Sequence, residues 1–161
     1  MQMDPNKKQA ALRMISNGLY ILTSRSGKKF GGATVSWLSQ ASFKPPLIMA
    51  AIRPTSSLFE CLAESRAVAV HILGAHQEGI ARKFLSTTRM ADELLNGEPF
   101  VEGVTSSPIL RNISSYLECR VRKIIEEGGD HAVVLMEVVH AEHSEDVRPL
   151  LVADSPWKYG G

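Results

Sequence analysis

The residues best suited to holding a polar ligand lie between Phe30 and Pro46. Gly31 and Gly32 leave the main chain open to close approach by another surface, since neither residue carries a Cβ. Short side chains that can donate and accept hydrogen bonds follow this glycine pair. They are Thr34, Ser36, Ser39, Gln40 and Ser42. Such a wall of main chain and hydroxyl groups suits a flat polar ligand, but an ordinary strand and turn has the same composition.

A second group of residues could bind an anion. Thr55-Ser56-Ser57 is expected to open a helix, because Ser57 and Glu60 match the spacing of a capping box. The first turn of a helix presents free N–H groups and the positive end of the helix dipole, and both favour phosphate. Basic residues that could add charge are Arg53, Arg82 and Lys83. A capped helix with solvated basic neighbours explains the same pattern.

One histidine stands where it could contact a substrate. Asp130-His131 follows the pair Gly128-Gly129, so the imidazole is expected at the mouth of a strand. A histidine there could orient a substrate or hydrogen-bond to a ring, although a turn histidine with a structural partner is the simpler alternative. The other histidines have no ligand spacing with one another, and no metal site is expected. Trp37, Trp157 and Tyr159 could stack on an aromatic ligand, or pack in the core or a dimer contact.

The composition and charge of the chain argue against several function classes. A chain of 161 residues can bury a proper core, and we expect a single domain over residues 1–161. Hydrophobic residues make up 44% and charged residues 22%, which is typical of a soluble globular protein. The formal net charge of +1 gives no electrostatic reason to expect nucleic acid or an anionic membrane as a partner.

The cysteines and the first residues indicate a cellular location. Cys61 and Cys119 are far apart in the sequence, so they form no zinc pattern, and a single disulfide remains an open alternative. The segment from Met1 to Lys8 lacks the apolar core of a signal peptide, and no apolar run reaches membrane-spanning length. We expect a reduced, cytoplasmic protein.

Hydrophobic periodicity defines the elements that must position these residues. Residues 116–124 alternate apolar and charged side chains, as a half-exposed strand does, and residues 126–130 should turn the chain into a return strand over 131–140. Further strands are expected over 19–24, 47–52, 67–73 and 149–152, and within the opening stretch 30–46. Helices are expected over 9–15, from 55–57 onward, over 76–85, and near 90–95 inside an excursion spanning 86–113. Strands joined by hairpin turns, with few helices, favour an antiparallel barrel with helices packed outside it.

The order and spacing of these segments resemble the flavin reductase-like family, whose fold is a flavin-binding split barrel. The resemblance covers nearly the whole chain. The segments that carry it are Gly18–Thr23, Gly32–Phe43 with Pro45-Pro46, Ser56-Ser57, Gln77–Phe84, Tyr116–Cys119, Gly129–His131 and Pro149–Leu151. It implies a mainly β fold, an antiparallel split β-barrel of the FMN-binding type with flanking helices.

The resemblance also implies a cofactor and its site. The expected assembly is a homodimer with one flavin per subunit, FMN or alternatively FAD, and NAD(P)H as the transient electron donor. Carried over by position, the residues that line the isoalloxazine ring are Thr34, Val35, Ser36, Trp37, Ser39 and Gln40. Those that hold the ribityl phosphate are Arg53, Ser56, Ser57, Lys83 and Phe84. His131 is the expected catalytic residue, and it would orient the donor rather than act as an obligatory acid.

Two activities follow from the resemblance, and both stay open at this point. The first is an NAD(P)H-dependent flavin oxidoreductase that moves hydride to flavin N5 and passes electrons to a downstream acceptor, such as a partner oxygenase or redox protein. The second is a flavoredoxin-like electron carrier reduced by a protein partner; Trp37 and Gln40 resemble that group. A barrel that has lost flavin is a third alternative, against which the intact stretch from Thr34 to Ser42 argues.

Overall fold

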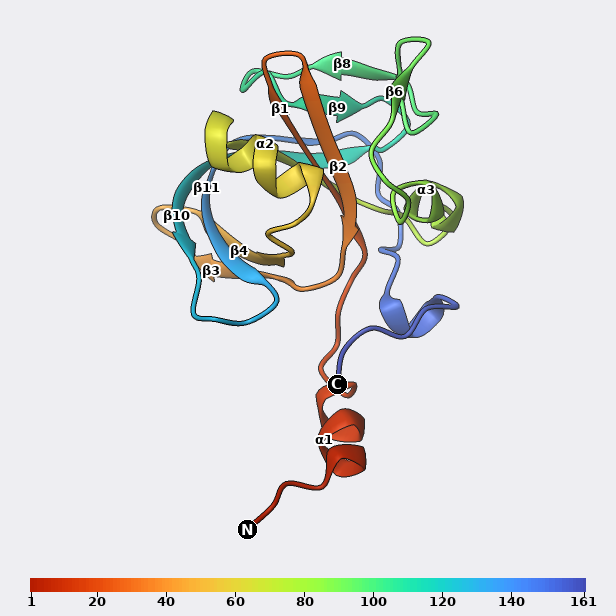
Figure 1. Cartoon of the computed structure of the whole chain (residues 1–161). Helices are drawn as coiled ribbons and strands as arrows, with labels where there is room; N and C mark the ends of the chain where they lie inside the picture. The colour runs from red at the N-terminus through yellow and green to blue at the C-terminus, as the bar shows by residue number, and fades with distance from the viewer.

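The computed structural model describes residues 1–161, and a curled seven-stranded antiparallel sheet forms its centre (Figure 1). The strands of this sheet are β1 (Tyr20–Ser26), β2 (Lys29–Val35), β3 (Leu38–Ser42), β4 (Leu47–Ile52), β5 (Ala67–Ile72), β10 (Ser115–Ile125) and β11 (Ala132–His143). Their order across the sheet is β2-β1-β5-β10-β11-β4-β3, so β2 and β3, which follow one another in the chain, form its two edges. The expected mainly β, antiparallel fold with few helices is confirmed.

Both faces of the sheet are covered near β1 and β5, and this explains their sequences. Successive strand residues point to opposite faces. Leu22 therefore packs into the core enclosed by the curl, while Ile21 packs into a second core under the excursion that follows α3 (Glu78–Lys83). Every residue of β5 from Ala67 to His71 is buried, as in a strand covered on two sides.

Helices α1 and α2 begin where backbone donors find side-chain acceptors. In α1 (Pro5–Leu12), Asp4 accepts from the N–H groups of Asn6 and Lys7, so this helix starts four residues before the expected 9–15 range. No residue of α1 is buried, and the helix projects from the body of the molecule (Figure 1). In α2 (Ser57–Ser65), the cap is Ser56, whose Oγ accepts from the N–H of Phe59. The expectation that Ser57 caps α2 was one residue late.

The excursion over 86–113 contains hairpins instead of the short helix expected near 90–95. Its strands are β6 (Met90–Ala91), β7 (Leu94–Leu95), β8 (Phe100–Glu102) and β9 (Pro108–Leu110). The helix prediction was wrong because Asp92 and Glu93 take positive φ angles of 53° and 62°, which turn the chain back between β6 and β7. The expected strand over 149–152 is reduced to isolated bridges at Pro149 and Leu151, followed by the short helix η1 (Val152–Asp154).

Buried polar side chains fasten the excursion to the sheet. His71 bonds to the Ile21 carbonyl through Nδ1 and accepts from the Leu110 N–H through Nε2, both at 2.9 Å. Burial lowers the pKa of His71 to about 4, because the charged imidazolium is disfavoured away from water. Glu118 is also buried, and its carboxylate accepts from the N–H and the hydroxyl of Thr105. Each buried acceptor therefore has a partner in the excursion.

The two cysteines are free thiols inside the fold. Cys61 and Cys119 form no disulfide and are both buried. Burial, followed by the charge of Glu118, raises the pKa of Cys119 to about 12. Burial also raises the pKa of Cys61. No helix of the chain combines the length and apolarity needed to cross a membrane.

A close backbone contact joins β2 to α2. A Cβ built on Gly31 would lie 2.6 Å from both the Leu58 Cα and the Ser57 carbonyl oxygen. Any side chain at Gly31 would therefore collide with helix backbone, which cannot rotate away as a side chain can. The absence of a Cβ lets the strand lie directly against the first turn of the helix.

We expect Gly31→Ala to lower the free energy of unfolding by about 1–3 kcal/mol, because the new methyl group forces α2 away from β2. Urea denaturation measures this difference. Gly79→Ala is the matched control: Gly79 lies in α3, and a Cβ there meets nothing within 4 Å. That control should be neutral or stabilising by up to about 1 kcal/mol, since alanine favours helix. Equal effects at the two sites would contradict the contact.

Candidate functional site

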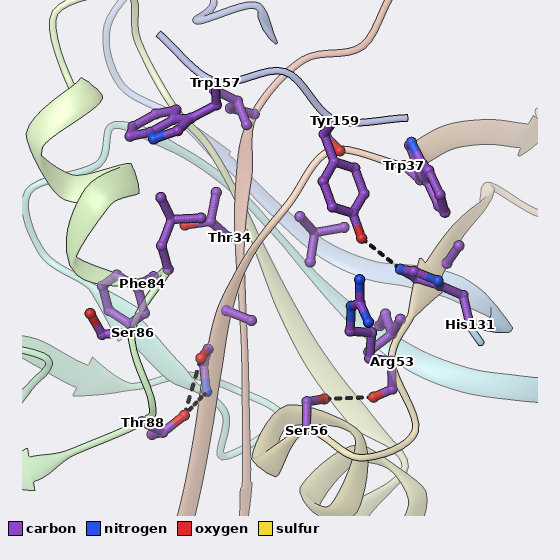
Figure 2. Close-up of a pocket in the computed structure, with 18 of the residues that line it drawn as sticks. Thr34, Trp37, Arg53, Ser56, Phe84, Ser86, Thr88, His131, Trp157 and Tyr159 are labelled. Carbon is purple, nitrogen blue, oxygen red and sulfur yellow. Dashed lines mark hydrogen bonds between the residues drawn. The ribbon is translucent and has the colours of Figure 1, made fainter. Parts of the chain in front are cut away.

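A cavity of about 550 Å3 opens at one edge of the sheet (Figure 2). Its walls come from the end of β2, the start of α2, the segment after α3 and the C-terminal tail. The lining contains Arg53 and Lys158 but no aspartate or glutamate. The charged side chains on the cavity wall are therefore all basic, which favours an anionic ligand.

Most of the residues expected at a ligand site meet in this cavity. Those on its wall are Thr34, Val35, Ser36, Trp37, Arg53, Ser56, Ser57, Phe84 and His131. Three others lie elsewhere. Ser39 lines a separate hollow, Gln40 is exposed on β3, and the ammonium group of Lys83 lies 2.7 Å from the Glu98 carboxylate.

The β2 side of the cavity is a wall tied to the segment after α3. The Thr34 N–H donates to the Phe84 carbonyl, and the Thr34 hydroxyl donates to the Ala81 carbonyl at 2.7 Å. The Thr34 hydroxyl proton is thus committed inside the protein. Ser36 lies two residues further along the same wall and is 7% exposed. Its side chain makes no hydrogen bond within the chain, so its hydroxyl remains available to a ligand.

The start of α2 forms the anion-binding end. Helix geometry leaves the N–H groups of Ser57 and Leu58 without intrahelical partners. The Ser56 hydroxyl caps the helix and also donates to the Arg53 carbonyl at 2.8 Å, which holds the chain in a turn before the helix (Figure 2). The hydroxyls of Thr55 and Ser57 line the cavity without an intramolecular partner. The helix dipole and the free donors therefore meet at the start of α2, and Arg53 lies immediately before this turn, at the end of β4.

Sequence reasoning missed one wall of the cavity, the hydroxyl run Ser86-Thr87-Thr88 directly after Leu85. The Thr88 hydroxyl bonds to both the N–H and the carbonyl of Gly32, each at 3.1 Å, and so occupies the open edge of β2 (Figure 2). Ser86 and Thr87 make no side-chain hydrogen bond within the chain. Three consecutive hydroxyl residues after a short basic helix were the available signal in the sequence.

A cluster of rings lines the cavity beside Arg53, since the pairing of Ile52 with Ala132 brings Arg53 next to His131. The His131 ring lies 4.6 Å from the Trp37 ring, the Tyr159 ring lies 4.9 Å from Trp37, and the His131 and Tyr159 rings are 6.2 Å apart. The Asp130 carboxylate is 2.7 Å from Nδ1 of His131, and the Tyr159 hydroxyl is 2.8 Å from Nε2 (Figure 2). The hydrogen bond that His131 donates lowers the pKa of Asp130. Asp130 is therefore an ionised acceptor at neutral pH.

Taken together, the walls fit a planar ring system that carries a phosphate. Gly32 brings the wall close to Phe84, since a Cβ there would lie 2.9 Å from that ring, and an aromatic surface thus lies beside the open main chain. The start of α2 and the ring cluster line one cavity, which suits a flavin mononucleotide. No group of three or more His, Cys, Asp or Glu side chains is arranged to hold a metal ion.

The comparisons with known proteins agree in family. The family model described as "Flavin reductase like domain" matches residues 12–159. The NADH:FMN oxidoreductase of Rhodococcus qingshengii is 34% identical over 149 residues, which is 89% of this chain and 75% of the relative. The FMN reductase (NADH) SmoA of Agrobacterium fabrum is 29% identical over 135 residues, which is 84% of this chain and 75% of the relative.

A solved structure of similar fold is the NADH:FAD oxidoreductase SgcE6 of Streptomyces globisporus C-1027. It superposes with a TM-score of 0.78 at 26% identity, covering 94% of this chain and 91% of that protein. The flavin reductase BorF of a bacterial two-component tryptophan halogenase shares the fold alone. Its TM-score is 0.75 at 21% identity, covering 85% of this chain and 86% of that protein. The family model spans nearly the whole chain, and the relatives align with it over most of their own length. The chain therefore belongs to the flavin reductase-like family.

Proposed function

We propose that the protein is an NAD(P)H:flavin oxidoreductase that holds FMN in the cavity at the edge of the sheet. The observation that carries this proposal is that an open helix start and a cluster of rings line one cavity. The names of the relatives, NADH:FMN oxidoreductase and FMN reductase (NADH), support the same donor and flavin. A single domain over residues 1–161, working in the cytoplasm and passing electrons to a partner oxygenase or redox protein, completes the proposal.

The side chains of the site bind and align. Arg53 and the N–H groups that open α2 hold the phosphate, and the wall from Thr34 to Trp37 lies along the ring system. When bound, the flavin supplies the acceptor for the hydride and its electron pair. His131 orients the donor beside it. No acid or base is needed to break a bond in the donor, so alignment and exclusion of water are the main contributions of the protein.

The proposed reaction is tested by the visible spectrum of the purified protein with added FMN, before and after NADH or NADPH is added without oxygen. We expect a bound-flavin spectrum that bleaches with at least one of the two nucleotides. Bound flavin that stays oxidised until dithionite is added would instead favour the flavoredoxin-like electron carrier. If the protein does not bind flavin, both readings are wrong.

The phosphate end can be tested with two ligands that differ only in phosphate. Arg53→Gln should weaken FMN binding about tenfold or more, since a charge-assisted hydrogen bond contributes about 1.5–3 kcal/mol. Riboflavin, which lacks the phosphate, should lose no more than about twofold, a change within the context-dependent spread of such contributions. Quenching of flavin fluorescence measures both affinities. Arg120→Gln, which removes a charge from the exposed face of β10, is the control. Equal losses for the two ligands would place the phosphate elsewhere.

We also propose a homodimer formed through an apolar hollow on the outer side of Trp37. The hollow measures about 480 Å3 and is lined by Leu12, Ile15, Met49 and Val133, among others. All four of these side chains are at least a third exposed; Leu12 ends α1, a helix with no buried residue, and Ile15 lies three residues beyond it. A second copy of the chain is the proposed occupant, because the family resemblance implies a dimer with the flavin near its interface.

Met49→Glu is expected to convert the dimer into a monomer, since it buries an unpaired carboxylate in the proposed interface. Size-exclusion chromatography with light scattering measures the mass. Val101→Glu makes the same change at an exposed valine of β8, outside the hollow, and should leave the dimer intact. A wild-type mass of one chain at micromolar concentration would overturn the proposal.

A further inference from the structure

The imidazole of His131 has no free nitrogen to offer a ligand. Nδ1 lies 2.7 Å from the Asp130 carboxylate, and Nε2 lies 2.8 Å from the Tyr159 hydroxyl. An ionised carboxylate only accepts hydrogen bonds, so Nδ1 carries the proton and donates it to Asp130. In the neutral imidazole Nε2 is then an acceptor, and the Tyr159 hydroxyl donates to it. The chain of donors runs from Tyr159 to His131 to Asp130.

This direction of donation determines what the ring cluster presents to the cavity. The Tyr159 O–H donates its hydrogen bond to His131, and the phenolic oxygen keeps lone pairs that can accept from a ligand. Tyr159 lines the cavity, and the lining has no aspartate or glutamate to compete as an acceptor. Of the linked pair Tyr159 and His131, the acceptor available to a ligand is therefore the phenolic oxygen of Tyr159 and not a nitrogen of His131.

The position of Tyr159 is fixed from both sides along the C-terminal strap, which we define as residues 155–161. Before Tyr159, the Trp157 ring lies 5.1 Å from the guanidinium carbon of Arg82. After it, the Gly160 carbonyl accepts from Nε of Arg13 at 3.1 Å. Gly160 has a φ of +116°, which side chains other than hydrogen rarely allow. The phenol is thus held before any ligand arrives, as a binding group should be.

We propose that the phenolic oxygen of Tyr159 accepts a hydrogen bond from the carboxamide N–H2 of the nicotinamide donor. His131 and Asp130 are positioning residues that act through it. The assignment rests on the proposed function and names the atom that recognises the donor. The surroundings suit this ligand, because Trp37 and His131 supply flat surfaces for a planar ring. The carboxamide is the polar substituent of that ring.

The test compares two reduced donors, NADH and its 3-acetylpyridine analogue, in which a methyl group replaces the amide nitrogen. Tyr159→Phe keeps the ring and removes the acceptor. It should lower kcat/KM for NADH about tenfold and for the analogue no more than about twofold, because only NADH loses a hydrogen bond. The ratio of the two effects cancels the intrinsic difference in reactivity between the donors. Tyr116→Phe removes a phenol hydroxyl from β10, outside the cavity lining, and is the matched control.

Two further measurements separate donor recognition from a structural role. Calorimetry on the FMN-loaded protein should show that Tyr159→Phe binds NAD+ about fivefold more weakly than the wild type, because the loss of one neutral hydrogen bond has about this effect. The affinity for FMN should be unchanged. His131→Phe keeps a ring against Trp37 but removes the partner of Tyr159. It should also reduce the discrimination between NADH and the analogue. The double variant should lose no more kcat/KM for NADH than Tyr159→Phe alone, since both changes act on one contact.

The outcomes distinguish this assignment from the proposed function. If wild-type protein loaded with FMN oxidises neither NADH nor NADPH, the proposed function fails and the assignment fails with it, before any variant is made; if only NADPH is oxidised, the same comparison is made with NADPH and its 3-acetylpyridine analogue. If the wild type is active and Tyr159→Phe lowers kcat/KM equally for both donors, or for neither, the function stands and the assignment of Tyr159 is overturned. Selective loss with NADH alone supports it.

Discussion

The contact between β2 and the first turn of α2 is the constraint on which the site depends. At Gly31 the strand backbone lies directly against helix backbone, with no room for a Cβ. The contact fixes the open N–H groups at the start of α2 beside the wall that begins at Thr34. An anion-binding point and a flat polar surface are thereby held at a set separation by main chain alone. Side chains such as Arg53 then add charge to a geometry that already exists.

The site also makes use of the exposed edge of the sheet. An edge strand presents unpaired backbone groups that invite association with another chain. Here the Phe84 carbonyl and the Thr88 hydroxyl bond to the backbone of Thr34 and Gly32, and so protect the edge of β2. The segment that provides this protection also forms a cavity wall. Shielding the edge and building the site are therefore achieved by the same few residues.

Sequence patterns predicted what depends on local chemistry. The alternation along β10 and the hydroxyl residues before α2 identified a strand and a helix start, because neighbouring residues decide both. The helix expected near 90–95 was wrong, because its apolar spacing resembles a helix while Asp92 and Glu93 turn the chain. Contacts between residues far apart in the sequence could not be predicted from local patterns. Lys83 pairs with Glu98, and Tyr159 meets His131 from 28 positions away, partnerships that only the folded chain defines.

The two buried thiols have a consequence for a protein that handles electrons in air. A reduced flavin that meets oxygen gives up its electrons to form hydrogen peroxide, and peroxide oxidises cysteine only as the thiolate. Burial raises the pKa of Cys119 to about 12 and that of Cys61 as well, so both remain protonated at neutral pH. The two cysteine thiols of this fold therefore react poorly with the by-product formed nearest to them.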